Sequence, residues 1–141
     1  MIRHLILSIP FLLPITSFAG DLKIHFTNFK NDSGTVLFLI FNDEEGYPDK
    51  NSKSFKEGRI TAKLAMSEGL LLENIPDGPY AITAFHDENN NDELDTGLFG
   101  IPREGFAFSN NPIVLFGPPS YSKSKFKIQG QKKIELKFKY F

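Results

Sequence analysis

The chain has no cysteine, and that absence removes several structural classes at once. A lipoprotein anchor, disulfide bonds and thiolate metal sites all need cysteine, so the fold must be held by its core. An excess of either charge is also missing, since the chain has 16 basic and 17 acidic residues. Bulk charge therefore gives no reason to expect a nucleic-acid partner.

Long hydrophobic runs are scarce as well. One run, from Leu5 to Ile15, is 11 residues long, which is short of the roughly 20 residues that a membrane-spanning helix needs. Arg3 precedes it, and the small residues Ser17 and Ala19 follow it with the spacing of a cleavage signal. Residues 1–19 are therefore predicted to be a secretory signal peptide, cleaved near Ala19.

The predicted mature chain, residues 20–141, is 122 residues long and is expected to form one exported domain without a membrane span, periplasmic or extracellular. Its charges are unevenly distributed. Residues 123–139 hold seven lysines and one glutamate, whereas residues 87–95 hold five acids and no base. The lysines are interpreted as a solvated strand face.

Alternation of apolar and polar residues between turn signals predicts seven to nine short strands. They are expected at residues 21–29, 35–41, 59–66, 70–75, 80–86, 113–116, 125–128 and 132–140. The 35–41 segment, TVLFLIF, is apolar on both faces, so it is expected to be central and covered on both sides. Segments 59–66 and 70–75 are expected to form a hairpin.

No convincing helix is expected, apart from a short helical turn near Ser52–Lys56 within a long loop at 42–58. The pattern favours an all-β fold, an antiparallel β-sandwich of two sheets with Greek-key links, immunoglobulin-like or transthyretin-like. A small closed barrel is the alternative. Aromatic residues near the end of the chain are predicted to plug the open end of the core, or else to line a ligand surface: Phe99, Phe106, Phe108, Phe116 and Tyr121.

The most informative stretch is the acidic loop HDENNNDELDTG. Asp87, Asn89, Asn91 and Asp95 fall at relative positions 1, 3, 5 and 9. Oxygen ligands at such spacing are typical of loops that surround Ca²⁺, which takes six to eight oxygens. The backbone carbonyl of Glu93 would add a ligand at position 7.

The loop departs from an EF-hand in three ways. Position 6 is Asp92 rather than glycine, position 12 is Leu98 rather than glutamate, and no helix flanks the loop. Glu104 is therefore the candidate closing ligand. The predicted calcium ligands are Asp87, Asn89, Asn91, Glu93, Asp95 and Glu104. The alternative is that these residues form Asx turns and remain in water.

A catalytic interpretation would use His86 beside Asp87, with Asp95 or Glu104 as a second carboxylate and Ser109 as nucleophile. The sequence has no Gly-x-Ser-x-Gly elbow, no His-Glu-x-x-His pair and no phosphate-binding loop. We therefore expect a protein that is not an enzyme, with a small hydrolase centred on His86 and Asp87 as the alternative.

Three blocks, YAITAFHDENNNDELD, GIPREGFAFSNN and FGPPSYSKSKFKI, resemble the bacterial exported family known as domain of unknown function 2141. The likeness spans essentially the whole predicted mature chain. It is carried by Gly78, Tyr80, Ala81, His86, Asp87, Asn89, Asn91, Leu94, Asp95, Gly100, Pro102, Glu104, Gly105, Phe108, Ser109, Asn110, Pro118 and Pro119. The resemblance implies export and a β-sandwich similar in style to transthyretin-like or carboxypeptidase-regulatory domains, and it implies no reaction.

Together these observations predict an exported, non-catalytic β-sandwich whose acidic loop binds calcium. The neighbouring aromatic turn is expected to present a surface to another envelope protein or a glycan. A purely structural module without a bound ion is the remaining alternative.

Overall fold

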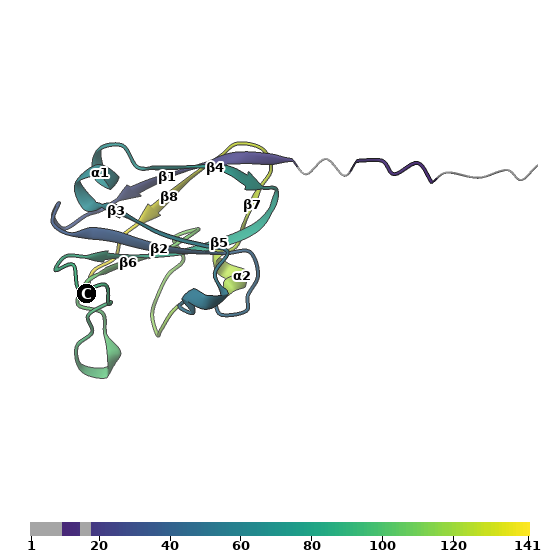
Figure 1. Ribbon diagram of the computed structural model, residues 1–141. Coiled ribbons are helices and arrows are strands. Elements are labelled where there is room, and N and C mark those ends of the chain that lie inside the picture. The colour runs from purple at the N-terminus through teal and green to yellow at the C-terminus, as the bar shows by residue number, and fades with distance from the viewer. Residues whose placement is uncertain (1–9, 15–17) are drawn as a thin grey trace, which may run out of the picture.

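The computed structural model of the chain describes residues 10–14 and 18–141. Two β-sheets lie one above the other (Figure 1). The smaller sheet has the strand order β4 (Leu70–Pro76), β1 (Ala19–Thr27) and β8 (Lys132–Lys137). The larger has the order β3 (Lys56–Thr61), β2 (Thr35–Phe41), β5 (Gly78–Asp87) and β6 (Gly105–Phe108), with β7 (Phe126–Ile128) paired to the first residues of β5.

The core lies between the sheets because each strand turns alternate apolar side chains inward. Leu22, Ile24 and Phe26 of β1 face Val36, Phe38 and Ile40 of β2 in one buried cluster. The other strands contribute Leu72, Ile75, Tyr80, Ile82, Ala84, Ala107, Ile128 and Leu136, and Phe138 joins the cluster just after β8. The all-β sandwich is confirmed, and the described residues do not close into a barrel.

One strand pair is not antiparallel, contrary to expectation. β8 runs parallel to β1, in register from Leu22↔Lys132 to Thr27↔Lys137. This pairing is possible because residues 28–131, which include α2 (Tyr121–Ser124) and β7, separate β1 from β8, and parallel neighbours need a long crossover rather than a tight hairpin turn. The other strand pairs in the described residues are antiparallel.

The predicted strand at 59–66 is wrong in its second half. β3 ends at Thr61, and α1 follows at Ala62–Ser67. The Thr61 side chain accepts a hydrogen bond from Leu64 N, which caps the helix, and Ala62 and Ala65 are buried at helical spacing. The expected hairpin is also absent, because β3 pairs with β2 whereas β4 pairs with β1 in the other sheet.

Two further predictions need correction. Residues 113–116 are not a strand, and Ile113, Leu115 and Phe116 are exposed. β2 is central, as expected, but its outer face is fully buried only at Phe41. The predicted helical turn is present as a 3-10 turn, η1, at Asn51–Lys53.

The predicted signal peptide falls largely on residues 1–9 and 15–17, outside the described residues. Residues 10–14 are exposed and lie away from the sheets (Figure 1). In the part of the chain that the structure describes, no helix has the length and apolar character needed to cross a membrane.

Candidate cation-binding loop

The acidic loop begins where β5 ends, at a point held tightly by its neighbours. β5 pairs with β2 as far as Thr35↔Asp87, which fixes the direction in which the loop leaves the sheet. Gly34 lies against the Asp87 carbonyl with φ +74°, and a Cβ at this position would collide with that backbone. Asp87 itself is fully buried. The loop therefore starts from a rigid platform rather than from a frayed strand end.

The Asp87 carboxylate determines how the loop winds. One oxygen accepts from Asn91 N at 3.2 Å and the other from Asp92 N at 2.8 Å. These donors are positions 5 and 6 of the loop, so the chain curls back over its first carboxylate. Asp92 has φ +64°, the left-handed conformation that a calcium loop usually assigns to glycine. The sharp turn is thus made despite the missing glycine.

Asp95 lies between two amides. Its oxygens accept from Asn89 Nδ2 at 2.6 Å and Asn91 Nδ2 at 2.7 Å. The amide oxygens form successive Asx turns, Asn89 with Asn91 N at 3.3 Å and Asn91 with Glu93 N at 3.1 Å. Positions 3, 5 and 9 are therefore joined in one network, as the alternating spacing predicts.

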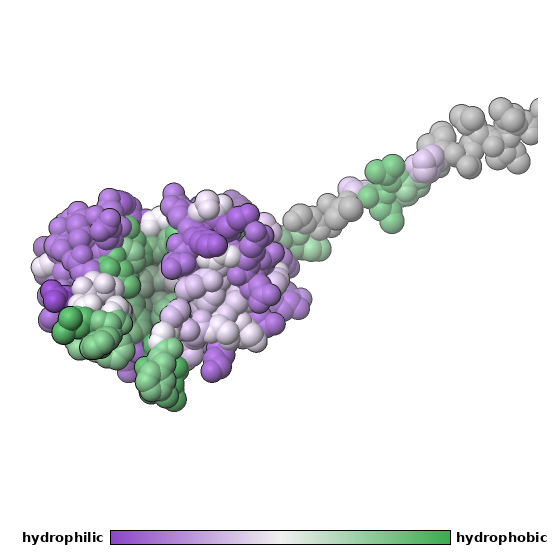
Figure 2. Space-filling view, turned by 90° about the horizontal axis from the view of Figure 1, so that it is seen from below, coloured by the Kyte–Doolittle hydropathy of each residue, from purple (hydrophilic) through white to green (hydrophobic). Residues whose placement is uncertain are grey.

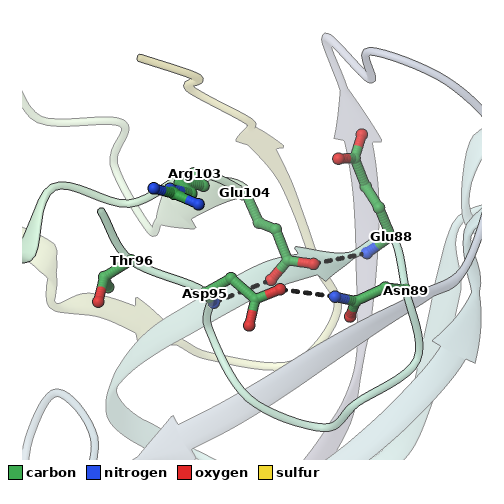
Figure 3. A pocket seen from close by; sticks show the side chains of 6 residues that line it. All are labelled: Glu88, Asn89, Asp95, Thr96, Arg103 and Glu104. Carbon is green, nitrogen blue, oxygen red and sulfur yellow. Dashed lines mark hydrogen bonds between the residues drawn. The ribbon is translucent and has the colours of Figure 1, made fainter. Parts of the chain in front are cut away.

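Glu104, which directly precedes β6, folds back onto the loop. Its Oε1 accepts from Glu88 N at 3.0 Å and its Oε2 accepts from Asp95 N at 3.1 Å (Figure 3). The side chain is only 4% exposed. Arg103 N also donates to Asp95 O at 2.8 Å, which pairs the two segments along their backbones. One carboxylate thus connects both ends of the loop.

The even-numbered residues of the loop point the other way and fasten it to the rest of the domain. Glu88 accepts from Asn31 Nδ2 at 2.7 Å, Asn90 accepts from the Thr35 hydroxyl at 2.7 Å, and Asp92 forms an ion pair with Arg59 at 2.8 Å. The side chains of Asp87, Asn89, Asn91 and Asp95 instead bond within the loop.

A shallow cavity of about 320 Å³ opens beside Glu104 and Asp95. Figure 3 shows the remaining lining side chains from both segments, Glu88, Asn89, Thr96 and Arg103. Sequence reasoning missed Arg103, although it is adjacent to Glu104 in the chain. It also missed Asn31, Thr35 and Arg59, for which no signal was available because they come from other strands and turns.

Five of the six predicted ligands therefore contribute side chains to one network: Asp87, Asn89, Asn91, Asp95 and Glu104. Glu93 takes part through its backbone N–H, and its side chain is exposed. Within the described residues no three carboxylate or histidine side chains gather by themselves as a metal-ligating cluster.

The His86 ring is enclosed by the fold. It is fully buried, and its Nε2 lies 2.6 Å from Ser33 O, so Nε2 donates. Its Nδ1 then accepts from the Tyr140 hydroxyl at 2.9 Å. Burial raises the pKa of Tyr140, outweighing the lowering effect of the Lys30 N–H, so this donor stays protonated. Both ring nitrogens are engaged within the fold.

Ser109, the conceivable nucleophile, is also fully buried. Its Oγ accepts from Ile82 N at 2.9 Å and contacts Ser124 O at 2.5 Å as a donor. Its hydrogen bonds link β5 to α2, whereas those of His86 lead to Ser33 and Tyr140. The arrangement of a hydroxyl beside a histidine base that a hydrolase needs is not formed by these two residues.

Comparison with known proteins bears on this whole region. A family model described as "uncharacterized protein conserved in bacteria", domain of unknown function 2141, matches residues 24–135. The chain belongs to this family. The matched residues include the acidic loop and Glu104. The match confirms the resemblance carried by the three sequence blocks. No curated protein and no solved structure matches the chain.

Proposed function

We propose that this member of the family is an exported, non-catalytic β-sandwich module whose loop 87–95, closed by Glu104, binds a calcium ion. The observation that carries the proposal is the convergence of Asp95, Asn89 and Asn91 beside Glu104. Carboxylate and amide oxygens are the ligands that Ca²⁺ prefers.

Two of the loop's departures from an EF-hand are met by its geometry. Asp92 takes the left-handed conformation at position 6 without being glycine. Glu104 reaches the loop from sixteen residues beyond Glu88 and so can stand in for the absent acid at position 12. A calcium loop built on a β-sandwich has no second helix to supply that ligand, so a carboxylate from a neighbouring segment supports the proposal.

Each residue has a distinct part. Asp87 winds the loop through the N–H groups of Asn91 and Asp92. Asp95 supplies the central charge. Asn89 and Asn91 donate to Asp95, and they become ligands by turning the amide so that oxygen replaces nitrogen. A bound calcium ion would supply two positive charges among the five acids of residues 87–95.

Export is supported by the composition of residues 1–19, with Arg3 ahead of an 11-residue apolar run. Phe11, Leu12 and Leu13 are exposed. Their segment, residues 10–14, lies away from the sheets (Figure 1), as expected of a segment that is not part of the folded domain. The lack of a catalytic role is supported by the complete engagement of His86 and Ser109.

Isothermal titration of the chelator-treated full chain with CaCl₂ tests the calcium site. We expect one ion bound with Kd between about 0.1 and 1 mM, the range of exported modules. At about 10 mM calcium this affinity stabilises the fold by about 1.4 to 2.7 kcal/mol, which raises Tm by roughly 4 to 15 °C for a domain of this size.

Two variants that each remove one negative charge make the test specific. Asp95→Asn is expected to abolish the heat of binding, because it weakens the central ligand. Glu93→Gln keeps the backbone carbonyl and is expected to bind calcium nearly as well as the wild type. If the wild type gave no heat and its Tm were unchanged by chelator, the calcium proposal would be wrong, and the loop would be purely structural. Equal loss in both variants would indicate nonspecific charge attraction.

A further inference from the structure

The five most exposed large apolar side chains of the domain lie on two loops. One loop, residues 96–102, carries Leu98, Phe99 and Ile101, and Phe99 is 97% exposed. The other, residues 112–119, carries Ile113, Leu115 and Phe116, and Phe116 is 99% exposed. Single exposed apolar residues are ordinary, but two clusters of three call for a binding role. We call them the two apolar tips.

The tips project from the same side of the sandwich, below the larger sheet (Figure 1). Seen from that side, apolar surface covers both tips and continues into the hollow between them (Figure 2). The outer face of the larger sheet contributes half-buried apolar residues to this side, since Leu37 pairs with Phe85 across β2 and β5. Phe106, which pairs with Phe85 from β6, is buried and adds no exposed surface.

Both loops are firmly held at their bases. The first is closed by the Thr96↔Pro102 bridge and by Gly97 N donating to Ile101 O at 2.7 Å. At the second, Lys139 Nζ donates to Pro112 O at 2.6 Å, and Asn110 donates to the carbonyls of Lys123 and Lys125. The tips are thus presented by fixed stems, and exposure of the aromatic rings is a property of the fold.

Cationic residues also lie at these bases. The Arg103 side chain runs alongside Gly97 at the first loop. Lys139 Nζ contacts Pro112 O at the base of the second loop, and Lys123 and Lys125, whose carbonyls accept from Asn110, are exposed. In a phospholipid surface, acyl chains lie beneath anionic phosphates. Apolar side chains at the loop tips would meet the acyl chains, and basic residues at the loop bases would meet the phosphates.

We propose that the two apolar tips insert into the surface of a phospholipid bilayer, with Arg103, Lys123, Lys125 and Lys139 facing the headgroup phosphates. Phe99 and Phe116 touch almost nothing in the domain, and a protein partner would need a socket for each projecting tip. A bilayer receives such tips without a complementary shape. The negative loop 87–95 adjoins the first tip, so apolar contact must supply most of the attraction.

The absence of tryptophan allows a direct test. Single-tryptophan variants Phe99→Trp and Phe116→Trp of the full chain are mixed with vesicles of phosphatidylethanolamine and phosphatidylglycerol in EDTA. We expect a blue shift of the emission and quenching by brominated lipid. Leu64→Trp in α1 and Leu71→Trp in β4 are matched reporters of exposed apolar sites elsewhere, and they are expected to be unaffected.

Partitioning measured by co-sedimentation supplies the second readout. The exported chain with its mature N-terminus should lose roughly tenfold or more in vesicle affinity on Phe99→Ser with Phe116→Ser, whereas Leu64→Ser with Leu71→Ser should bind as the wild type does. Because EDTA is present throughout, failure of the calcium site does not affect this result.

The proposal is overturned if both tip reporters stay unshifted at saturating lipid, including when the chain itself sediments with vesicles. It is overturned also if the tip reporters shift with protein concentration in the absence of lipid and the chain dimerises by sedimentation velocity, which would assign the tips to a second copy. Equal affinity for vesicles of pure phosphatidylcholine would refute the role given to the four cations.

Discussion

At the scale of single residues, the Glu104 carboxylate accepts hydrogen bonds from both ends of the acidic loop. It is nearly buried, yet its charge is stabilised because each oxygen accepts a backbone N–H, from Glu88 and from Asp95. Those two N–H groups would otherwise lack partners beside the loop. The residue is therefore a structural clamp whether or not a cation is bound.

Glu104→Ala, studied in EDTA, is expected to lower the free energy of unfolding by about 2 to 3 kcal/mol, because two poorly solvated N–H groups lose a charged acceptor. Glu104→Gln retains one acceptor and should lose about half as much. The exposed Glu93→Ala is the control and should stay within about 0.5 kcal/mol of the wild type. Urea unfolding measures all three. A loss below that of the control would show that the clamp contributes nothing.

The same scale explains how the His86 side chain is enclosed by the fold. It follows the inward face of β5, so its ring enters the core, 5.3 Å from the Phe29 ring centroid. Ser33 O and the Tyr140 hydroxyl satisfy its two nitrogens. A histidine beside an aspartate in the sequence points to catalysis only when both face the same space, and period-two alternation sends these two to opposite faces.

At the scale of elements, the chain changes from strand to helix at Thr61. The residues AKLAMS alternate in polarity as a strand would, but they also include strong helix formers and place Ala62 and Ala65 three apart. The hydroxyl of Thr61 satisfies Leu64 N at 3.3 Å. Short apolar patterns fit both periods, and here the cap decides between them.

Thr61→Ala is expected to destabilise the protein by about 1 kcal/mol, because α1 loses its side-chain cap. Thr61→Ser keeps the hydroxyl and should restore most of that stability. Thermal unfolding of the two variants under identical conditions makes the comparison. If serine proved as destabilising as alanine, the lost interaction would be that of the threonine methyl group, and the cap would contribute no stability.

The loops are the elements in which sequence patterns performed worst. Phe106 is buried as predicted, but Phe99 and Phe116 do not plug the core. Composition alone does not distinguish a ring inside an open end from a ring on a projecting loop. The bridge Thr96↔Pro102, which lifts the first loop away from the sheets, forms between residues that show no strand pattern.

At the scale of the whole molecule, a domain without disulfides is closed by pairing its first and last strands. β1 lies between β4 and β8, so both ends of the folded region are held in one sheet. Tyrosines secure the joins between this frame and its loops. The Tyr47 hydroxyl donates to Ser124 Oγ at 2.7 Å, linking the 42–58 loop to α2, and Phe41 packs edge-on against the Tyr47 ring.

Because of these tyrosines, the stability of the fold is expected to decrease at alkaline pH. Burial raises the pKa of Tyr47 and outweighs the lowering effect of its hydrogen bond to Ser124, and burial likewise raises that of Tyr140. In the unfolded chain each tyrosine ionises near 10.0, below its folded value. Their contribution is therefore fully present below pH 10 and is lost as the pH rises through the folded pKa.

Urea midpoints measured between pH 9 and pH 11 should fall for the wild type. Tyr47→Phe should be less stable at pH 7, having lost one hydrogen bond, but its midpoint should fall less steeply above pH 10. Lysine titration occurs in both proteins, so the difference between the two slopes isolates Tyr47. Parallel slopes would contradict the assignment.

The amino-acid sequence by itself determined the all-β class, most of the inward-facing core and the odd-numbered residues of the acidic loop. These follow from period-two alternation and from ligand spacing, which are local properties of the chain. The pattern of Asp87, Asn89, Asn91 and Asp95 was therefore visible before any fold was known.

Only the tertiary structure decided which strands are neighbours, that β8 joins β1 in parallel, and that Arg59 and Thr35 hold the loop from outside. It also brought Glu104 to the two ends of the loop and sent Phe99 and Phe116 outward. These outcomes depend on contacts between segments far apart in the chain, whose formation is governed by the packing of whole sheets rather than by any local pattern.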